Sequence, residues 1–207
     1  MSRYGHIMVG AGSARCVVAA RLSENADNWV LLPEAGKDDS SVENVHVPPA
    51  WLALLGTEVD WAFETTPQPG TENLPYNRPR GKELGGARSI NAMVYLRRHR
   101  NDFDNWATGD TIGWDYEGVL SYFRKMETAE GDPEYRGTSG PMQPKIAADA
   151  TPLSEVFLNA TKEPDYPRTD DFNDAVQEGA GSRELTAPRR RVRGRRSLPR
   201  PVDGFHR

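Results

Sequence analysis

Two glycines and one acidic residue near the start of the chain have the spacing of a nucleotide-binding turn. Gly10 and Gly12 follow an apolar run at residues 4–9, and Glu34 stands 24 residues after Gly10, at the end of a second apolar run. In such turns the first glycine allows the bend, the second lets backbone approach a pyrophosphate, and the N-terminus of the next helix attracts the phosphates. An acidic side chain placed like Glu34 can accept a hydrogen bond from a ribose hydroxyl. The pattern indicates nucleotide binding; the alternative is a glycine turn beside a solvated glutamate.

Two residues depart from this motif. Arg15 stands where a third glycine usually permits close packing of the helix on the strands. An arginine there must point outward or push the helix away, at a cost of about 1–3 kcal/mol by analogy with overpacking. Pro33 removes a backbone donor from the second strand.

A second glycine constellation, RGKELGG, spans residues 80–86 and is followed by SINAM at residues 89–93. Two adjacent glycines before a helix suggest backbone close to an anion or a flat ring. On composition alone, a glycine-rich turn with basic residues in solvent is the simpler interpretation.

The order of apolar runs and glycines predicts the fold class. A strand at residues 4–9, a helix at 14–26 and a strand at 29–32 form the opening βαβ unit of a doubly wound α/β domain. Residues 37–80 predict a mostly irregular excursion with one short helix. Further helices are expected at residues 89–98, at 101–107, after the cap Asp115 through 125, and after the cap Thr151 through 162.

Seven segments in one order carry a family resemblance over residues 4–181. They are GAGSA, LLPEAG, GTEVDWAFETTPQP, PRGKELGG, SINAM, GWDYEGVLSYFRKME and YPRTDDFN. Together they resemble the glucose–methanol–choline (GMC) oxidoreductase family, and most of all its choline-dehydrogenase-like bacterial members. The resemblance implies an α/β fold, an incomplete FAD-binding Rossmann-like doubly wound domain with long irregular excursions, several helices and a disordered C-terminal tail.

The resemblance also implies which residues contact FAD. The glycine turn and the acidic residue hold the ADP part, PRGKxLGG lies along the pyrophosphate and flavin, and Asn-Ala-Met-Val lies beside the isoalloxazine ring. The residues that match are Gly10, Gly12, Ser13, Ala14, Glu34, Arg80, Gly81, Leu84, Gly85, Gly86, Asn91, Ala92, Met93 and Val94. Ala87-Arg88 departs from the family pattern; Arg88 either clamps phosphate or occupies the space of FAD, and we favour the second.

The family oxidises the CH–OH group of an alcohol to an aldehyde and passes a hydride to flavin N5, with a histidine near the C-terminal end as the base. The histidines of this chain are His6, His46, His99 and His206, and none matches that position. His6 is expected to be structural and His99, in the basic run 97–100, to be solvated. We assign no catalytic residue and no metal ligand, and expect the chain to be inactive alone.

Composition changes abruptly after residue 181. Residues 182–207 hold nine Arg against two acidic residues, a balance of +7 that leaves −11 for residues 1–181, since the whole chain carries −4. The stretch has three prolines and few large apolar residues, so we expect no element there. The domain division is therefore a partial GMC-type FAD-binding domain at 1–181 and an Arg/Pro-rich disordered tail at 182–207, for which a shifted reading frame is one hypothesis.

Three other functions remain open at this point. The first is a truncated product without activity, and the second is weak binding of polyanions through the Arg-rich tail. The third is an NAD-dependent Rossmann enzyme, but the segments PRGKELGG and SINAM argue against it.

The predicted partners are FAD, a small-molecule alcohol and a complementing C-terminal chain, with no specific nucleic acid. No apolar run is long enough to span a bilayer. The single cysteine, Cys16, excludes an internal disulfide and predicts a cytoplasmic location.

Overall fold

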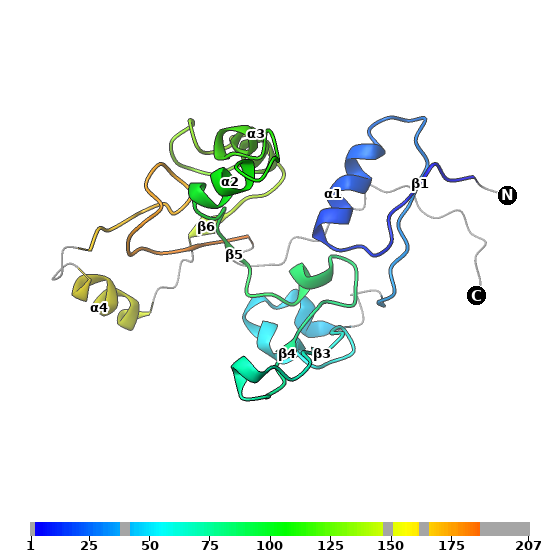
Figure 1. The fold of residues 1–207 in the computed structure, drawn as a ribbon, viewed down its shortest axis with the longest axis horizontal. Helices are drawn as coiled ribbons and strands as arrows, with labels where there is room; N and C mark the ends of the chain where they lie inside the picture. Colours follow the sequence, from blue (N-terminus) through cyan, green and yellow to red (C-terminus); the bar gives the residue numbers. More distant parts are fainter. Residues whose placement is uncertain (1–2, 38–41, 147–150, 162–165, 187–207) are drawn as a thin grey trace. The chain divides into compact units, whose positions relative to one another are not determined.

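The computed structural model describes residues 3–37, 42–146, 151–161 and 166–186 (Figure 1). The chain divides into two compact units. The described part of the first unit is residues 3–37 and 42–92, and that of the second is residues 93–146, 151–161 and 166–186.

The first unit opens with the predicted βαβ arrangement. Strand β1 (His6–Ile7) and strand β2 (Val30–Leu31) are parallel, with His6 opposite Val30 and Ile7 opposite Leu31, and helix α1 (Ser13–Leu22) connects them (Figure 1). The βαβ prediction is confirmed, although both strands are shorter than expected.

Pro33 explains where the regular pairing of β2 ends. The N–H groups of Met8 and Gly10 still donate to the carbonyl oxygens of Leu31 and Pro33, each at 2.8 Å. Pro33 has no N–H with which to return a bond, so the ladder continues in one direction only. The lost donor shortens the strand but leaves the chain beside β1.

Helix α1 begins one residue earlier than predicted and ends at Leu22, four residues early. Its last carbonyls already have side-chain partners, because the Ser23 hydroxyl donates to Ala19 O at 2.9 Å and the Asn28 amide donates to Leu22 O at 2.9 Å. Ala19 is fully buried, whereas Arg15 is exposed. Of the two outcomes predicted for Arg15, the structure has the outward one.

The excursion contains more short elements than expected. Its described residues form the 3₁₀ helices η2 (Glu43–His46), η3 (Pro48–Leu54) and η4 (Pro69–Thr71), and an antiparallel hairpin of β3 (Phe63–Glu64) and β4 (Asn77–Arg78). A small apolar core holds these elements together, and its buried members are Val45, Leu54, Val59 and Ile90.

The predicted helix at 89–98 is wrong. The structure has a short 3₁₀ helix, η5 (Gly86–Ser89), followed by strand β5 (Val94–Tyr95). Met93 and Arg98 have φ of 60° and 65°, values that a right-handed helix cannot contain. A β-branched and an aromatic residue between these two breaks favour a strand.

The described part of the second unit combines α-helices with a small sheet. Helix α2 (Arg100–Ala107) packs on α3 (Tyr116–Met126), and α4 is Pro152–Ala160. In the antiparallel sheet, β7 (Glu184–Leu185) lies between β5 and β6 (Lys145–Ile146).

The helix starts in this unit follow the predicted signals. Asp115 is the N-cap of α3, and its carboxylate accepts from Gly118 N at 2.6 Å. Thr151 is the N-cap of α4, with Pro152 in its first turn. The predicted helix at 101–107 is confirmed as α2, and α4 ends at Ala160, slightly earlier than predicted.

Strand β7 corrects the expectation that nothing after residue 181 forms an element. Glu184–Leu185 pairs with strands on both sides, so that expectation is wrong for these residues. Residues 187–207, the rest of the predicted tail, and with them His206, lie outside the described residues.

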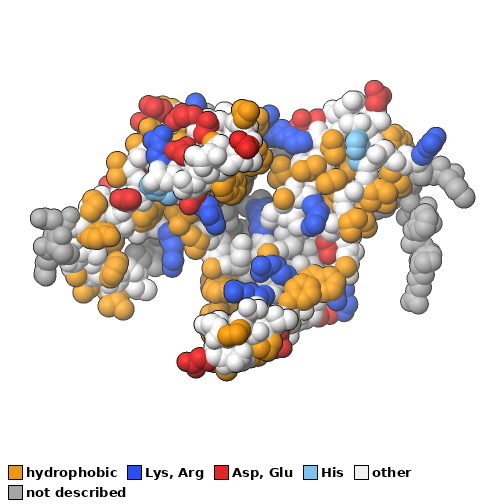
Figure 2. All heavy atoms as spheres, viewed as in Figure 1, with side chains coloured by type: hydrophobic (Ala, Val, Ile, Leu, Met, Phe, Trp, Pro, Cys, Tyr) orange, Lys and Arg blue, Asp and Glu red, His pale blue; other side chains and the backbone are white. Residues whose placement is uncertain are grey.

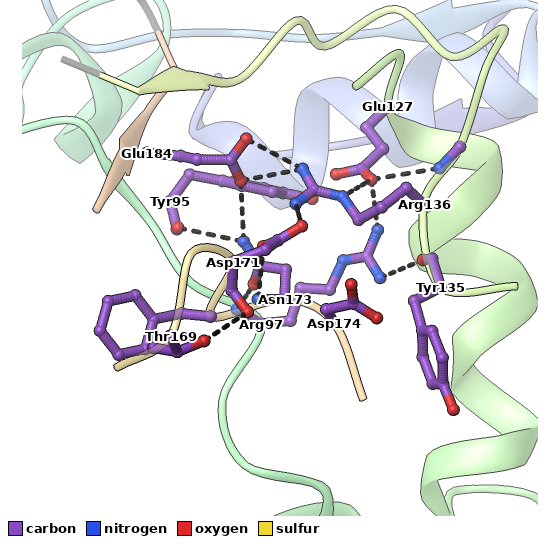
Figure 3. A network of polar contacts seen from close by, with 12 residues as sticks. Tyr95, Arg97, Glu127, Tyr135, Arg136, Thr169, Asp171, Asn173, Asp174 and Glu184 are labelled. Carbon is purple, nitrogen blue, oxygen red and sulfur yellow. Dashed lines mark hydrogen bonds and ion pairs between the residues drawn. The ribbon is translucent and has the colours of Figure 1, made fainter. Parts of the chain in front are cut away.

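A network of charged side chains fills the interior of the second unit (Figure 3). Glu127 is fully buried, and its Oε1 accepts from Arg97 Nη2 at 2.5 Å and from Arg136 Nε at 2.8 Å. The Arg136 guanidinium, 1 % exposed, also pairs with Asp171 at 2.5 Å and with Glu184 at 2.8 Å. Arg97, which belongs to the same basic run as His99, is buried.

Glu184 of strand β7 is part of this network. Asn173 donates to Glu184 Oε2 at 3.0 Å and accepts from Arg97 N at 2.8 Å. The pairing carboxylates raise the pKa of Arg136 despite its burial, which on its own lowers it. The guanidinium therefore stays charged and ties together segments near residues 127, 171 and 184.

Large apolar side chains are exposed on both units, as the hydrophobic surface atoms in Figure 2 illustrate. In the βαβ arrangement Ile7 and Val9 are 60 % and 71 % exposed, and Trp29 is 59 % exposed. Ile7 is in β1, and Val9 and Trp29 flank the two strands; large apolar side chains grouped in this way are uncommon on a protein surface. Among the described residues, no helix has the length and apolarity needed to cross a membrane.

Replacing Arg136 by Met should lower the free energy of unfolding of the second unit by about 3–5 kcal/mol, because buried Glu127 loses a charged partner. Urea unfolding followed by circular dichroism measures this. Arg168→Met, which removes a pair between exposed side chains of Arg168 and Asp170, is the control and should cost about 1 kcal/mol or less. Equal effects of the two changes would contradict the role given to the network.

Candidate cofactor-binding site

The two glycine motifs of the sequence lie against each other in the first unit. Gly12 and Gly85 form a parallel bridge, and Gly85 N donates to Ala11 O at 2.8 Å. A Cβ atom on Gly86 would stand 2.8 Å from Gly12 Cα, closer than real Cβ contacts come. Gly85 and Gly86 also have φ of 102° and 59°, which favour glycine. Only glycine fits this contact.

Two further glycines bring a third segment to the same place. A Cβ on Gly81 would lie 2.1 Å from Gly86 O, and a Cβ on Gly36 would lie 1.9 Å from Lys82 O. Residues 10–12, 34–36 and 81–86 therefore meet backbone to backbone. We call this arrangement the glycine junction.

Glu34 holds the junction from within. Its Oε2 accepts from Ala11 N at 2.6 Å, and its Oε1 accepts from Gly36 N at 2.9 Å. The carboxylate thus fixes the glycine turn that precedes α1. Each carboxylate oxygen has a second lone pair, so these bonds leave acceptor capacity for a ribose hydroxyl.

Asp60 positions the PRGKELGG segment. It is buried, and its carboxylate accepts from the backbone N–H groups of Gly56 at 2.9 Å, Ala62 at 3.0 Å and Arg80 at 2.8 Å. Burial on its own raises the pKa of Asp60, but these three donors and the nearby Arg80 charge outweigh it, so the pKa lies below its usual value. Backbone bonds from Lys82 N to Val59 O and from Trp61 N to Arg80 O add to this attachment.

Charged groups also surround the start of α1. The Cys16 thiol donates to Ala11 O at 3.1 Å, directly beneath the glycine turn. Burial raises the pKa of this thiol, the positive charge of Arg88 lowers it, and the negative charge of Glu34 raises it further. Arg88 and Glu34 are therefore both close enough to Cys16 to act on it electrostatically.

The junction is open on the side of Gly12. A Cβ built on Gly12 meets no protein atom within 4 Å, so the backbone there is accessible to another molecule. Gly12 is the N-cap of α1 and has no side chain to bond the first helical N–H groups, including those of the exposed Ser13 and Ala14. An accessible helix N-terminus beside a glycine turn fits the diphosphate of a dinucleotide.

The structure therefore brings most of the predicted contact residues together and leaves others apart. Gly10, Gly12, Glu34, Gly81, Gly85 and Gly86 form the junction, with Ser13 and Ala14 beginning α1. Arg80 and Leu84 are on the same segment with exposed side chains, while Asn91 and Ala92 follow η5 at the end of the first unit. Met93 and Val94 belong to the second unit, where Met93 O accepts from Thr186 N at 2.9 Å.

Sequence reasoning missed Asp60 and Gly36 as residues of the site. A lone carboxylate within the otherwise apolar run VDWAF was the available signal for Asp60. Gly36 appeared only as the last residue of the segment LLPEAG, because its contact with Lys82 joins residues far apart in the sequence.

These features define a dinucleotide-binding α/β protein. The comparison with protein families matches residues 4–201 to GMC oxidoreductase, so the chain belongs to the GMC oxidoreductase family. The match extends past residue 181, where the composition of the chain changes.

Known proteins agree with this assignment. The chain is 44 % identical over 187 residues to the oxygen-dependent choline dehydrogenase of Vibrio vulnificus, covering 88 % of this chain and 33 % of the relative. A crystal structure of pyridoxine 4-oxidase from Mesorbium loti superposes with a TM-score of 0.83 at 34 % identity, over 89 % of this chain and 36 % of that one. An FAD-dependent oxidoreductase from Chaetomium thermophilum has a TM-score of 0.79 at 30 % identity, over 89 % and 33 %.

The comparisons confirm the predicted family, its choline-dehydrogenase-like character and FAD as the cofactor of the family. The chain spans about a third of the length of the curated relatives it matches.

Asp60→Asn should lower the free energy of unfolding by about 2–3 kcal/mol at neutral pH, because the amide nitrogen cannot accept from the surrounding N–H groups. The pKa of Asp60 is lowered, so its contribution is complete above the usual value of 3.8 and is lost as the pH falls through the folded-state value. The difference between the two proteins should therefore shrink below about pH 4.

Urea titrations at several pH values, followed by tryptophan fluorescence, measure this difference. Asp27→Asn changes an exposed carboxylate of the same unit and should leave stability unchanged. A difference that stays constant down to strongly acidic pH would refute the role given to the Asp60 carboxylate.

Proposed function

We propose that this chain is the FAD-binding part of an oxidoreductase that acts on the CH–OH group of an alcohol. The observation that carries the proposal is the glycine junction, which joins both glycine motifs and Glu34 and leaves Gly12 open. Family membership supports the same cofactor.

Each part of the junction has a distinct role in this proposal. The first N–H groups of α1 bind the diphosphate, because they lack partners within the helix. Glu34, oriented by its two backbone donors, accepts from a ribose hydroxyl. The PRGKELGG segment, held by Asp60, lines the cofactor beyond the diphosphate. When bound, the flavin supplies the hydride acceptor for alcohol oxidation.

The substrate class follows from relatives and not from a site in this chain. One relative is named a choline dehydrogenase and one neighbour a pyridoxine 4-oxidase, and both substrates carry a primary alcohol. A small alcohol is therefore the substrate class that we propose for the complete enzyme, with a complementing C-terminal chain as the partner.

Gly12→Val should abolish FAD binding while leaving the fold intact. Gly12 has φ of −69° and open space around its Cβ position, so the protein tolerates a side chain there that would stand where the cofactor approaches. Fluorescence quenching of added FAD measures binding, and circular dichroism checks the fold. Gly70→Val is the matched control, because Gly70 also has open space but lies in η4, away from the junction.

If the unchanged protein quenches FAD fluorescence and Gly12→Val quenches it equally, the cofactor does not lie at the junction. Absence of binding by the unchanged protein would refute the proposal as a whole.

We expect no alcohol oxidation by the chain alone, even with FAD bound, because the base implied by the family resemblance is a histidine near the C-terminal end and no histidine of this chain matches that position. Of the described histidines, His6 is part of β1, His46 ends η2, and His99 accepts from Asn101 N at 3.2 Å as the N-cap of α2. Anaerobic addition of choline to the FAD-loaded protein, with flavin absorbance as the readout, tests this. Bleaching of the flavin by choline would show that the chain contains a catalytic base.

A further inference from the structure

Arg15 lies over the glycine turn. It stands in the first turn of α1, and its Nη1 atom is 3.6 Å from the point where a Cβ atom on Gly10 would stand. The side chain is exposed, and α1 keeps its packing with Ala19 fully buried. Arg15 thus replaces a glycine without displacing the helix, and its guanidinium reaches back to the turn.

Within the part of the chain that the structure describes, the Arg15 guanidinium has neither a hydrogen bond nor an ion pair. Arg21, on the last turn of the same helix, pairs with Glu24 at 2.6 Å. Arg15 therefore keeps all five of its N–H donors available at the place where the diphosphate of the cofactor is proposed to bind.

We propose that Arg15 is a diphosphate-binding residue of this chain, which contacts the cofactor phosphates from above the glycine turn. This inference rests on the proposed function. A guanidinium presents donors in a planar fork that matches two phosphate oxygens, and its bonds to phosphate are charge-assisted.

The negative charge of Glu34 explains why a cation at the junction favours binding of a diphosphate. Glu34 places a carboxylate against the glycine turn through its bond to Ala11 N. A diphosphate beside this carboxylate meets a like charge, which the helix N-terminus, with about half a positive charge, and Arg88, which also lies near the start of α1, offset only in part. Arg15 adds a full positive charge on the solvent side of the turn, which offsets the repulsion from Glu34.

The opposite outcome is that Arg15 fills space that the cofactor needs. The two alternatives predict opposite changes on removal of the side chain. A diphosphate-binding arginine makes binding weaker when it is removed, whereas an obstructing arginine makes binding tighter.

The test compares Arg15→Gln with the unchanged protein in titrations with FAD, ADP and adenosine, using fluorescence quenching for FAD and displacement of FAD for the others. We expect about tenfold weaker binding of FAD and of ADP, since a charge-assisted bond is lost, and unchanged binding of adenosine, which has no phosphate. Arg15→Lys should recover part of the loss. Arg21→Gln removes the same charge from the other end of α1 and should change none of the three affinities.

The results separate the inference from the proposed function. If Arg15→Gln binds FAD as tightly as the unchanged protein, or more tightly, the inference fails and the proposed function stands. If adenosine weakens as much as ADP, Arg15 acts through the fold and the inference also fails. If the unchanged protein binds neither FAD nor ADP, the proposed function fails and the inference with it.

Discussion

Backbone contact between distant segments is the constraint on which the first unit depends. At Gly36 and Gly81, a single added carbon would stand about 2 Å from a carbonyl oxygen. At Gly86 it would press on the glycine turn itself. The three segments of the junction can therefore meet only because these positions lack side chains, and the same close approach leaves the N-terminus of α1 beside an accessible surface.

The carboxylates of Glu34 and Asp60 stabilise this backbone contact whether or not a ligand is bound. Glu34 takes two backbone N–H groups and Asp60 takes three, so buried or half-buried charge is compensated by donors that the turns would otherwise leave unpaired. An acidic residue at the end of the second strand is usually interpreted as a ribose ligand. Here the same residue also fixes the glycine turn, so the fold orients Glu34 before any cofactor arrives.

Local signals predicted local structure well. The βαβ order, the cap at Asp115 and the cap at Thr151 depend on neighbouring residues, and all three are confirmed. The helix predicted at 89–98 failed because positive φ at Met93 and Arg98 results from tertiary contacts and not from the residue types. In the candidate site, the sequence predicted the glycines of both motifs but missed Gly36, and it could not predict that Gly81 faces Gly86 or that Gly36 faces Lys82.

In the second unit, too, the sequence did not indicate which charged residues are buried. Arg97 belongs to a run of basic residues, which gives no sign of burial, yet it is buried because Glu127 supplies its partner from thirty residues away. With Glu184 arriving from β7, the segment that composition assigned to a tail completes the partners of Arg136. A buried guanidinium is tolerated only when carboxylates surround it, so the position of β7 is set by the charge of Arg136 as much as by the ladder of the sheet. The composition of residues 182–207 alone therefore could not show that Glu184 and Leu185 form a strand, since the partner of Glu184 is Arg136, far away in the sequence.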